Sequence, residues 1–354
     1  MFCDGMNKCL FHFLFSEYKF YINLMKEKIK LKKKVIIDCD PGIDDSLALI
    51  LALNSPEIEV IGITTVSGNV KADQGARNVL KVLKLMKRED IPVYIGEEVP
   101  LERDLITAQD THGEDGLGET NYQQADVEIN YGGVDFILEK AINGNVSLIA
   151  LGPLTNLAKA IEKDLEAFNM INEIVSMGGA FKSHGNCSQV AEFNYWVDPH
   201  GVKEVFDKSK VPFSMVGLDV TREIVLTPNL IELIKQIGGD VANFIVDITK
   251  FYVDFHWKQE RTLGCVINDP LAVAYFIDRS ICEGFTSYLD IVVDGIAVGQ
   301  TLVDVGEFYK KEHNGLILNK VDSKKFMKMF LERIFPDNQK DIEIVLSNPK
   351  YGVN

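Results

Sequence analysis

The chain has 354 residues, of which 46% are hydrophobic and 25% charged, as expected for a globular protein with one large domain or two smaller ones. Its net charge is −15, and because residues 1–34 carry +5, the remainder is strongly acidic. The strong negative charge of the residues after 34 argues against nucleic acid and against an anionic membrane as partners.

The first 33 residues are predicted to form an extension outside the fold, so that the folded domain covers residues 34–354. The segment from Leu10 to Met25 is rich in aromatic residues, but charged residues interrupt it, which makes it too short and too polar to cross a bilayer. It also lacks a basic start and a small-residue cleavage site, which argues against a signal peptide. We expect residues 1–24 to be dispensable; an amphipathic surface helix is the alternative.

The first strand of the fold is predicted at residues 35–37, where three β-branched residues occur in a row. Pro41-Gly42 then predicts a turn, and the apolar run 43–53 is too long for a strand and predicts a buried helix. In an open parallel sheet, ligands bind at this strand-to-helix corner.

Four carboxylates lie within eight residues at that corner: Asp38, Asp40, Asp44 and Asp45. The helix N-terminus offsets the charge of Asp44 and Asp45 only, whereas a hard divalent cation such as Ca²⁺ or Mg²⁺ would offset the others. The alternative is that Asp44 caps the helix, Asp45 is solvated and Asp40 only shapes the turn. For the whole cluster we favour the cation.

Strand and helix patterns alternate along the rest of the chain. Strands are expected near 59–66, 92–95, 146–151, 173–177 and 212–216, and helices near 74–86, 133–143, after 153, after 198, across 228–258 with a break at Gly238-Gly239, and near 269–276 and 322–334. Shorter strands are expected near 289–293, 297–303 and 315–318. This order predicts an α/β fold in which a mostly parallel central sheet is flanked by helices, open and Rossmann-like, in a single domain with extra short strands near the C-terminus.

Two segments outside the acidic corner carry groups that suit a site. Residues 96–131 form a connection long enough to be a functional loop or a disordered one, and His112 within it is either a site residue or a surface histidine. The helix ending near residue 258 carries Tyr252 and His256, whose polar tips could line a ligand mouth. Six cysteines without CxxC spacing indicate neither a zinc motif nor a disulfide framework and favour a reduced cytoplasm.

The run from Asp38 to Asp45, read as Asp-x-Asp-Pro-Gly-x-Asp-Asp, resembles the signature of the nucleoside hydrolases of the inosine–uridine-preferring type. Further matches are Ser67-Gly68-Asn69, His112-Gly113 with Asp115-Gly116-Leu117-Gly118, Leu151-Gly152-Pro153-Leu154-Thr155-Asn156, Met177-Gly178-Gly179, Asn186, Glu192-Phe193-Asn194 and Asp269-Pro270-Leu271-Ala272-Val273. The resemblance covers about residues 33–335. It implies hydrolysis of the N-glycosidic bond of a ribonucleoside to free base and ribose, with one bound Ca²⁺, in nucleoside catabolism or salvage, by a cytoplasmic homodimer or homotetramer.

The resemblance also implies roles for individual residues. Asp40 would be the catalytic base and a calcium ligand, with Asp45, Asp269 and the backbone carbonyl of Leu151 as the other protein ligands. This set fits the oxygen preference of calcium, which would lower the pKa of the attacking water. Asp38 would orient its neighbours.

The substrate contacts implied by the resemblance come from the remaining motifs. The ribose hydroxyls would be held by Asp44, Asn69 and Asn194, and the 5′ side would be positioned by Met177, Asn186 and Glu192.

One position departs from the family pattern. Many members have a histidine directly before the aspartate matched by Asp269, assigned as the acid that protonates the leaving purine, and this chain has Asn268 there. An amide donates hydrogen bonds but cannot transfer a proton in this role. The base preference therefore stays open, and the candidates for contacting or protonating the base are Asn268, His112, Tyr252 and His256.

Two other functions are considered. Phosphohydrolases of the haloacid dehalogenase type also place Asp-x-Asp after a first strand, but Pro41-Gly42 and the doubled Asp44-Asp45 are foreign to their pattern. A nucleoside or ribose sensor without turnover would be consistent with Asn268, whereas the intact set of aspartates argues against it.

Overall fold

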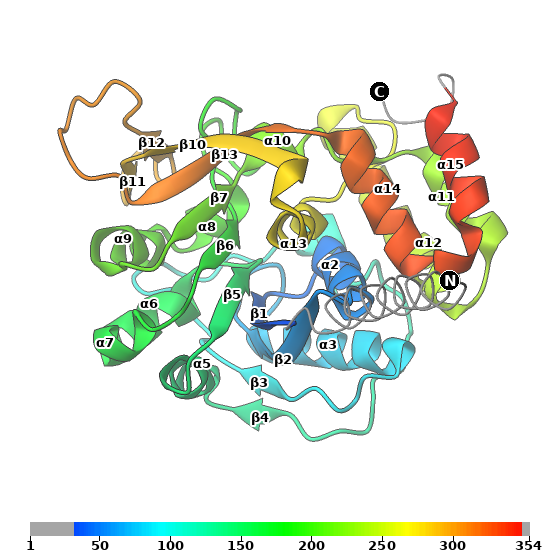
Figure 1. Ribbon diagram of the computed structural model, residues 1–354, viewed down its shortest axis with the longest axis horizontal. Helices are drawn as coiled ribbons and strands as arrows, with labels where there is room; N and C mark the ends of the chain where they lie inside the picture. The colour runs from blue at the N-terminus through cyan, green and yellow to red at the C-terminus, as the bar shows by residue number, and fades with distance from the viewer. Residues whose placement is uncertain (1–31, 349–354) are drawn as a thin grey trace, which may run out of the picture.

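A nine-stranded sheet forms the centre of the computed structural model, which describes residues 32–348 (Figure 1). The strand order is β10-β13-β7-β6-β5-β1-β2-β3-β4, and every neighbouring pair is parallel except β10 and β13. The predicted α/β fold with a mostly parallel central sheet is therefore confirmed. The strands of the sheet are β1 (Lys33–Cys39), β2 (Ile58–Thr65), β3 (Val93–Ile95), β4 (Asn130–Tyr131), β5 (Val146–Ala150), β6 (Ile174–Met177), β7 (Phe213–Val216), β10 (Cys282–Ser287) and β13 (Gly315–Val321).

Helices cover both faces of this sheet (Figure 1). One face is packed by α2 (Ile43–Leu53), α3 (Ala72–Met86), α11 (Pro228–Ile237), α12 (Asp240–Glu260), α13 (Asp269–Ile277), α14 (Ser323–Ile334) and α15 (Gln339–Ser347). The other face is packed by α5 (Gly133–Ile142), α6 (Thr155–Lys163), α7 (Leu165–Phe168) and α9 (Pro199–Lys208). Short elements complete the described chain: α4 (Gln109–His112), α8 (Phe193–Val197), α10 (Leu218–Thr221), two 3₁₀ turns (Arg279–Ile281 and Pro336–Asn338), and the two-stranded sheets β8 (Val225–Leu226) with β9 (Cys265–Val266) and β11 (Leu289–Ile291) with β12 (Thr301–Val303).

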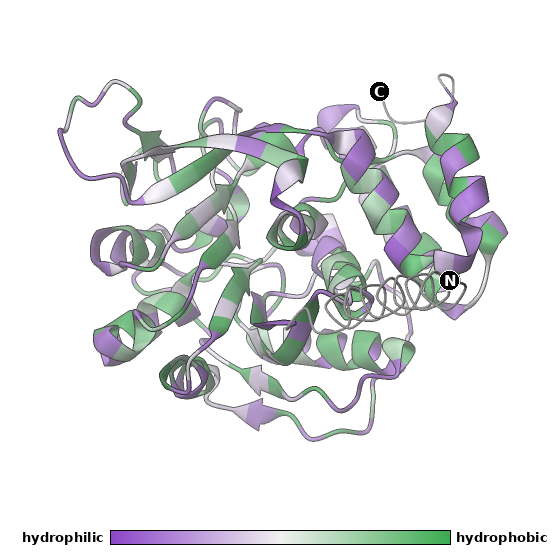
Figure 2. Ribbon diagram, viewed as in Figure 1, coloured by the Kyte–Doolittle hydropathy of each residue, from purple (hydrophilic) through white to green (hydrophobic). Residues whose placement is uncertain are grey.

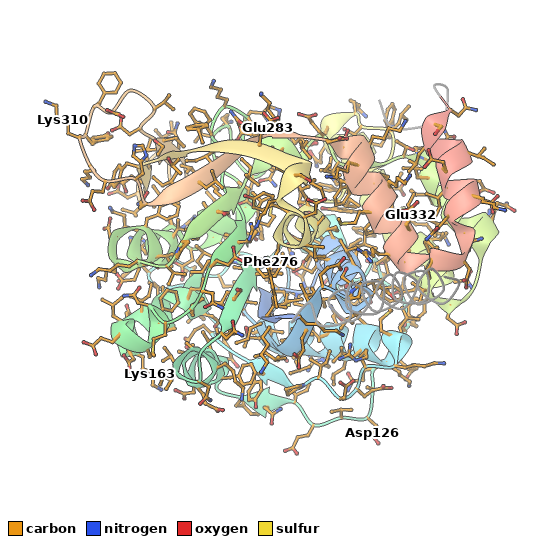
Figure 3. The ribbon with its side chains drawn as sticks, in the orientation of Figure 1. Asp126, Lys163, Phe276, Glu283, Lys310 and Glu332 are labelled. Atoms are coloured by element: carbon orange, nitrogen blue, oxygen red, sulfur yellow. The ribbon has the colours of Figure 1, made fainter. Side chains whose placement is uncertain are left out.

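The apolar run of β1 reflects its place at the centre. Val35 and Ile37 pack into the core on one face of the sheet, and Ile36 packs into the core on the other. A central parallel strand is buried on both faces, so its sequence is continuously hydrophobic. Figure 2 shows the same division across the molecule, with hydrophobic residues on the strands and on the helix faces turned toward them. Phe276 of α13 lies in the middle of the molecule, whereas Lys310 lies on the protruding loop after β12 (Figure 3).

Several boundaries differ from the sequence prediction. The break at Gly238-Gly239 is confirmed, and the connection 96–131 contains only α4 and β4. The edge strand β10 and the terminal helix α15 were not predicted, because neither has a long apolar run: only Cys282 and Ser287 of β10 and only Ile342 and Leu346 of α15 are buried. The predicted strand at 297–303 is shorter, since β12 starts at Thr301.

Two predictions concern the chain termini and the cysteines. The proposed extension, including residues 1–24, lies outside the described residues except that β1 already begins at Lys33. Within the described part of the chain, no helix has the length and hydropathy that a membrane span requires. The four described cysteines, Cys39, Cys187, Cys265 and Cys282, form no disulfide.

Candidate active site

A cavity of about 520 Å³ opens where the carboxyl ends of β1, β2, β5 and β6 meet α12 and α13. Its lining includes twelve of the residues proposed from sequence: Asp44, Asn69, His112, Leu151, Met177, Asn186, Glu192, Asn194, Tyr252, His256, Asn268 and Asp269. Segments more than two hundred residues apart in the chain thus meet at the corner that the β1–α2 pattern identified. Asp40 and Asp45 are fully buried and do not line the cavity. Both accept hydrogen bonds from Asn69, which does line it.

The Asp40 carboxylate is held between two glycines. A Cβ at Gly68 would lie 2.0 Å from Asp40 Oδ2, and one at Gly152 would lie 2.7 Å from Oδ1, so neither position tolerates a side chain without movement. Oδ2 accepts a hydrogen bond from the backbone N–H of Asn69 at 2.6 Å. Oδ1 is buried and has no partner among the described residues. An unpaired buried carboxylate oxygen is costly unless something binds it.

Asp44, Asp45 and Asp269 form a second group of carboxylates, with one oxygen of each within 4.8 Å of the other two. Asp45, rather than Asp44, accepts the N–H of Gly42 at the start of α2, at 3.0 Å, and it is buried rather than solvated. The alternative is therefore wrong about a cap at Asp44 and a solvated Asp45, since a buried Asp45 caps the first turn of α2. At this separation the three buried carboxylates repel one another when charged.

Burial and mutual repulsion raise the pKa of these acids. Burial raises the pKa of Asp45 to about 7, with a further contribution from the charge of Asp44. Burial likewise raises the pKa of Asp40 and of Asp269 well above the usual range, with neighbouring carboxylates adding to the effect. The unpaired Asp40 oxygen, the close approach of three carboxylates and the raised pKa values all fit a site that a divalent cation completes.

Asp38 lies behind this cluster and belongs to a network that the sequence did not reveal. Its Oδ1 accepts hydrogen bonds from Thr64 Oγ1 at 2.5 Å and from Asn156 Nδ2 at 2.7 Å. Asn156 also donates to the carbonyl of Thr65 and accepts the N–H of Glu97. Asn156 therefore ties the ends of β1, β2 and β3 together at the start of α6, and its position in the Leu-Thr-Asn-Leu motif was the available signal.

Asp44 faces the cavity and binds residues from the far end of the chain. Its Oδ2 accepts hydrogen bonds from Tyr252 Oη at 3.1 Å, from Asn268 Nδ2 at 3.1 Å and from the Asn268 backbone N–H at 3.2 Å. Asn268 makes no side-chain cap hydrogen bond to α13. Its amide is thus used to orient Asp44 and not to start the helix.

His112 lies at the end of α4 and is buried against the Asp40–Asp45 turn. Its Nδ1 accepts the backbone N–H of Ile43 at 3.0 Å. Asn78, which sequence reasoning missed, donates from Nδ2 to the carbonyls of Pro41 and Asp115 and so joins the turn to the His112 loop. The surface alternative for His112 is wrong, since this histidine is buried and lines the cavity.

The opposite wall is built by the turn that precedes α8. Glu192 accepts the N–H groups of Gly179, Asn194 and Tyr195, and burial raises its pKa to about 7. Asn194 Nδ2 donates to the carbonyl of Leu151 at 2.7 Å. Asn186 Oδ1 accepts the N–H of Phe193. These bonds fix the proposed sugar-side residues before any ligand binds.

The raised pKa values predict an unusual pH dependence of stability. An acid with a folded-state pKa above its unfolded value binds protons more tightly when folded, so stability falls as pH rises toward the folded pKa. For Asp38 the window runs from its ordinary pKa of 3.8 to about 7, because burial outweighs the two hydrogen bonds that lower its pKa. We expect the Tm of metal-free protein to fall between pH 5.5 and 8, at up to about 1.4 kcal/mol per pH unit for each such group.

Differential scanning calorimetry at several pH values measures this trend. The variant Asp38→Asn should show a shallower slope than the parent, and saturating Ca²⁺ should flatten it by offsetting the charges of Asp45 and Asp269. A Tm that rises steadily from pH 5.5 to 8 without metal would contradict the assignment.

Comparison with known proteins supports one family. The family model described as inosine-uridine preferring nucleoside hydrolase matches residues 35–328. The chain is 35% identical over 306 residues to a pyrimidine-specific ribonucleoside hydrolase, RihA, of Salmonella gallinarum, which covers 85% of this chain and 97% of the relative. A RihA protein of Klebsiella pneumoniae is similar to the same extent over 305 residues.

Solved structures lead to the same family. The fold matches a plant nucleoside hydrolase, PpNRh1, with a TM-score of 0.81 and 31% identity over 85% of this chain and 98% of that one. It also matches a purine-preferring ribonucleoside hydrolase from Gardnerella vaginalis, with a TM-score of 0.81 and 32% identity over 87% and 100% of the two chains. The named relatives thus differ in the base they act on.

Proposed function

The chain belongs to the inosine-uridine preferring nucleoside hydrolase family and is a ribonucleoside hydrolase, and from this premise we propose that Asp40 and a bound Ca²⁺ activate the attacking water. The observation that carries the proposal is the unpaired, buried Asp40 Oδ1 beside the Asp44–Asp45–Asp269 group. Asp40, Asp45, Asp269 and the carbonyl of Leu151 would hold the ion. When bound, the ion lowers the pKa of water and offsets the negative charge of the carboxylates.

Asp40 is the proposed general base of the reaction. Asp40 takes the proton of the water that attacks the anomeric carbon, while the C–N bond breaks through an oxocarbenium-like state. Its position between Gly68 and Gly152 keeps the carboxylate in one orientation. Because solvent is excluded around Asp40, the developing charge interacts strongly with the fixed groups near it.

The ribose is oriented by residues already bonded into the walls. Within residues 32–348, Oδ2 of Asp44 accepts the Tyr252 and Asn268 donors and Oδ1 accepts none, so Oδ1 would bind a ribose hydroxyl. Asn69 and Asn194 would hold the 2′- and 3′-hydroxyls, and Met177, Asn186 and Glu192 would position the 5′ side. A cytoplasmic location and assembly as a homodimer or homotetramer belong to the proposal, on the family resemblance alone.

Incubation with inosine, uridine, their 2′-deoxy forms and their 5′-monophosphates tests the substrate class. We expect free base from at least one ribonucleoside and about 10²-fold less from its 2′-deoxy form, because buried polar groups would be left unpaired. Chromatography of the products distinguishes base from phosphate. Equal rates on a ribonucleoside and its 2′-deoxy form would contradict the proposed contacts to the 2′-hydroxyl. Phosphate release without base release would favour a phosphohydrolase.

A further inference from the structure

The identity of the acid that protonates the departing base is decided by the hydrogen bonds of three side chains in the cavity. A base leaves poorly as an anion, and protonation of a ring nitrogen during cleavage typically contributes about 10²–10⁴-fold. Asn268 cannot supply a proton, and its amide is engaged by Asp44. The other three candidates from the sequence, His112, Tyr252 and His256, all line the cavity.

Tyr252 is held as a donor to a carboxylate. Its Oη lies 3.1 Å from Asp44 Oδ2, and burial together with the charge of Asp44 raises its pKa well above the usual range. The hydroxyl thus donates its proton in a hydrogen bond to Asp44, and transfer of that proton to the base would leave a buried phenolate beside a carboxylate. Tyr252 orients Asp44 and does not protonate the base.

His112 is held in one neutral tautomer. Its Nδ1 lies 3.0 Å from the backbone nitrogen of Ile43, and since a backbone N–H only donates, Nδ1 must carry a lone pair. The single ring proton is therefore on Nε2. Protonation of Nδ1 would place two N–H groups against each other, so His112 can donate a hydrogen bond but cannot alternate between its two charge states.

His256 has the opposite arrangement. Its Nδ1 lies 2.9 Å from the carbonyl of Tyr252, one turn earlier in α12, and a carbonyl only accepts, so Nδ1 carries a proton in both charge states. Its Nε2 has no hydrogen-bond partner within residues 32–348 and can hold or release the second proton without breaking the Nδ1 bond. The ring is packed against Tyr252, with centroids 4.4 Å apart, and it lines the same cavity as Asn268.

We propose that His256 Nε2 is the general acid for the leaving base, a role that rests on the ribonucleoside hydrolysis proposed above. The C–N bond breaks with its electron pair on the base, a ring nitrogen of the base takes the proton from His256, and Asp40 takes one from water as ribose forms. Both groups return to their starting states by proton exchange with solvent. Burial lowers the pKa of His256, and the charge of Arg222 acts in the same direction, as a charged His112 ring would. The hydrogen bond to the Tyr252 carbonyl and the charges of Glu260 and Asp44 act in the opposite direction and favour the protonated form.

His256→Gln tests this role, using whichever of inosine and uridine the parent hydrolyses faster alongside p-nitrophenyl β-ribofuranoside. Nitrophenolate leaves as a stable anion and needs no acid, whereas the nucleoside base needs one. We expect kcat for the nucleoside to fall about 10²–10³-fold, as loss of a general acid predicts, while the nitrophenyl riboside changes less than about threefold. Equal losses on the two substrates, or no loss on the nucleoside, would overturn the assignment.

Two further measurements keep the test decisive. His112→Gln, the matched variant, should affect the two substrates alike, because it removes a fixed hydrogen-bond donor and not an acid. If His256→Gln does not fold, the pH profiles of the parent decide: the nucleoside rate should decline with rising pH where the nitrophenyl riboside rate does not, and parallel profiles would overturn the proposal. A parent that releases neither base nor nitrophenolate would refute the proposed function itself.

Discussion

Replacing Asp40 by asparagine is expected to lower kcat by at least about 10³-fold, because the change removes a general base and a metal ligand together. The fold should survive. Oδ2 of Asp40 accepts only the Asn69 N–H, which an amide oxygen also accepts, and burial already makes the charged form of this carboxylate unfavourable. Base release under substrate saturation, with circular dichroism as the check on folding, measures the effect.

A buried carboxylate outside the cavity gives the matched control for this variant. Asp198 is fully buried and accepts the Gly201 and Leu101 N–H groups and the Thr155 hydroxyl. Asp198→Asn should lower Tm and leave kcat within about threefold of the parent, as a purely structural carboxylate requires.

Asn69→Ala, which keeps the backbone N–H on Asp40, should act mainly on KM. Parental activity in Asp40→Asn would refute Asp40 as the base.

Removal of divalent metal is expected to reduce base release by about 10³-fold or more, and Ca²⁺ should restore it. Without a cation, burial and the neighbouring carboxylates raise the pKa of Asp40, Asp45 and Asp269, which favours the protonated form of the proposed base. Smaller Mg²⁺ demands stricter octahedral geometry and should restore less activity.

Binding of Ca²⁺ should also raise the thermal stability of the protein. A ligand present at 100 times its Kd stabilises the folded state by about 2.7 kcal/mol, which calorimetry detects as a rise in Tm. Asp269→Asn should reduce that rise, whereas Asp198→Asn should retain it. Full activity in the presence of excess chelator would remove the ion from the mechanism.

Local patterns were sufficient to predict the frame of this molecule. The β-branched run 35–37, the Pro41-Gly42 turn and the apolar helix after it placed the four carboxylates at the sheet edge where the cavity lies. Such patterns depend on neighbours in sequence, which is why β10 and α15, with few buried residues, were missed.

The contacts that give the site its chemistry join distant segments, and no spacing predicts them. Asp44 bonds to Tyr252 and Asn268, which lie 208 and 224 residues away in the chain, and Asp38 bonds to Asn156 at a separation of 118. The three candidates for the acid could not be ranked from sequence for the same reason. Their ranking depends on which atom each ring nitrogen faces, and that is a property of the folded chain.

Titration of Ca²⁺ into the chelator-treated protein tests whether a single ion held by these carboxylates is required for base release. Isothermal titration calorimetry gives the number of ions bound per chain, and base release is measured on the same samples. We expect one high-affinity site per chain and a rate of base release that rises in proportion to its occupancy, from nearly zero to the full value. Full base release at negligible occupancy, or saturation of the site without any gain in rate, would contradict it.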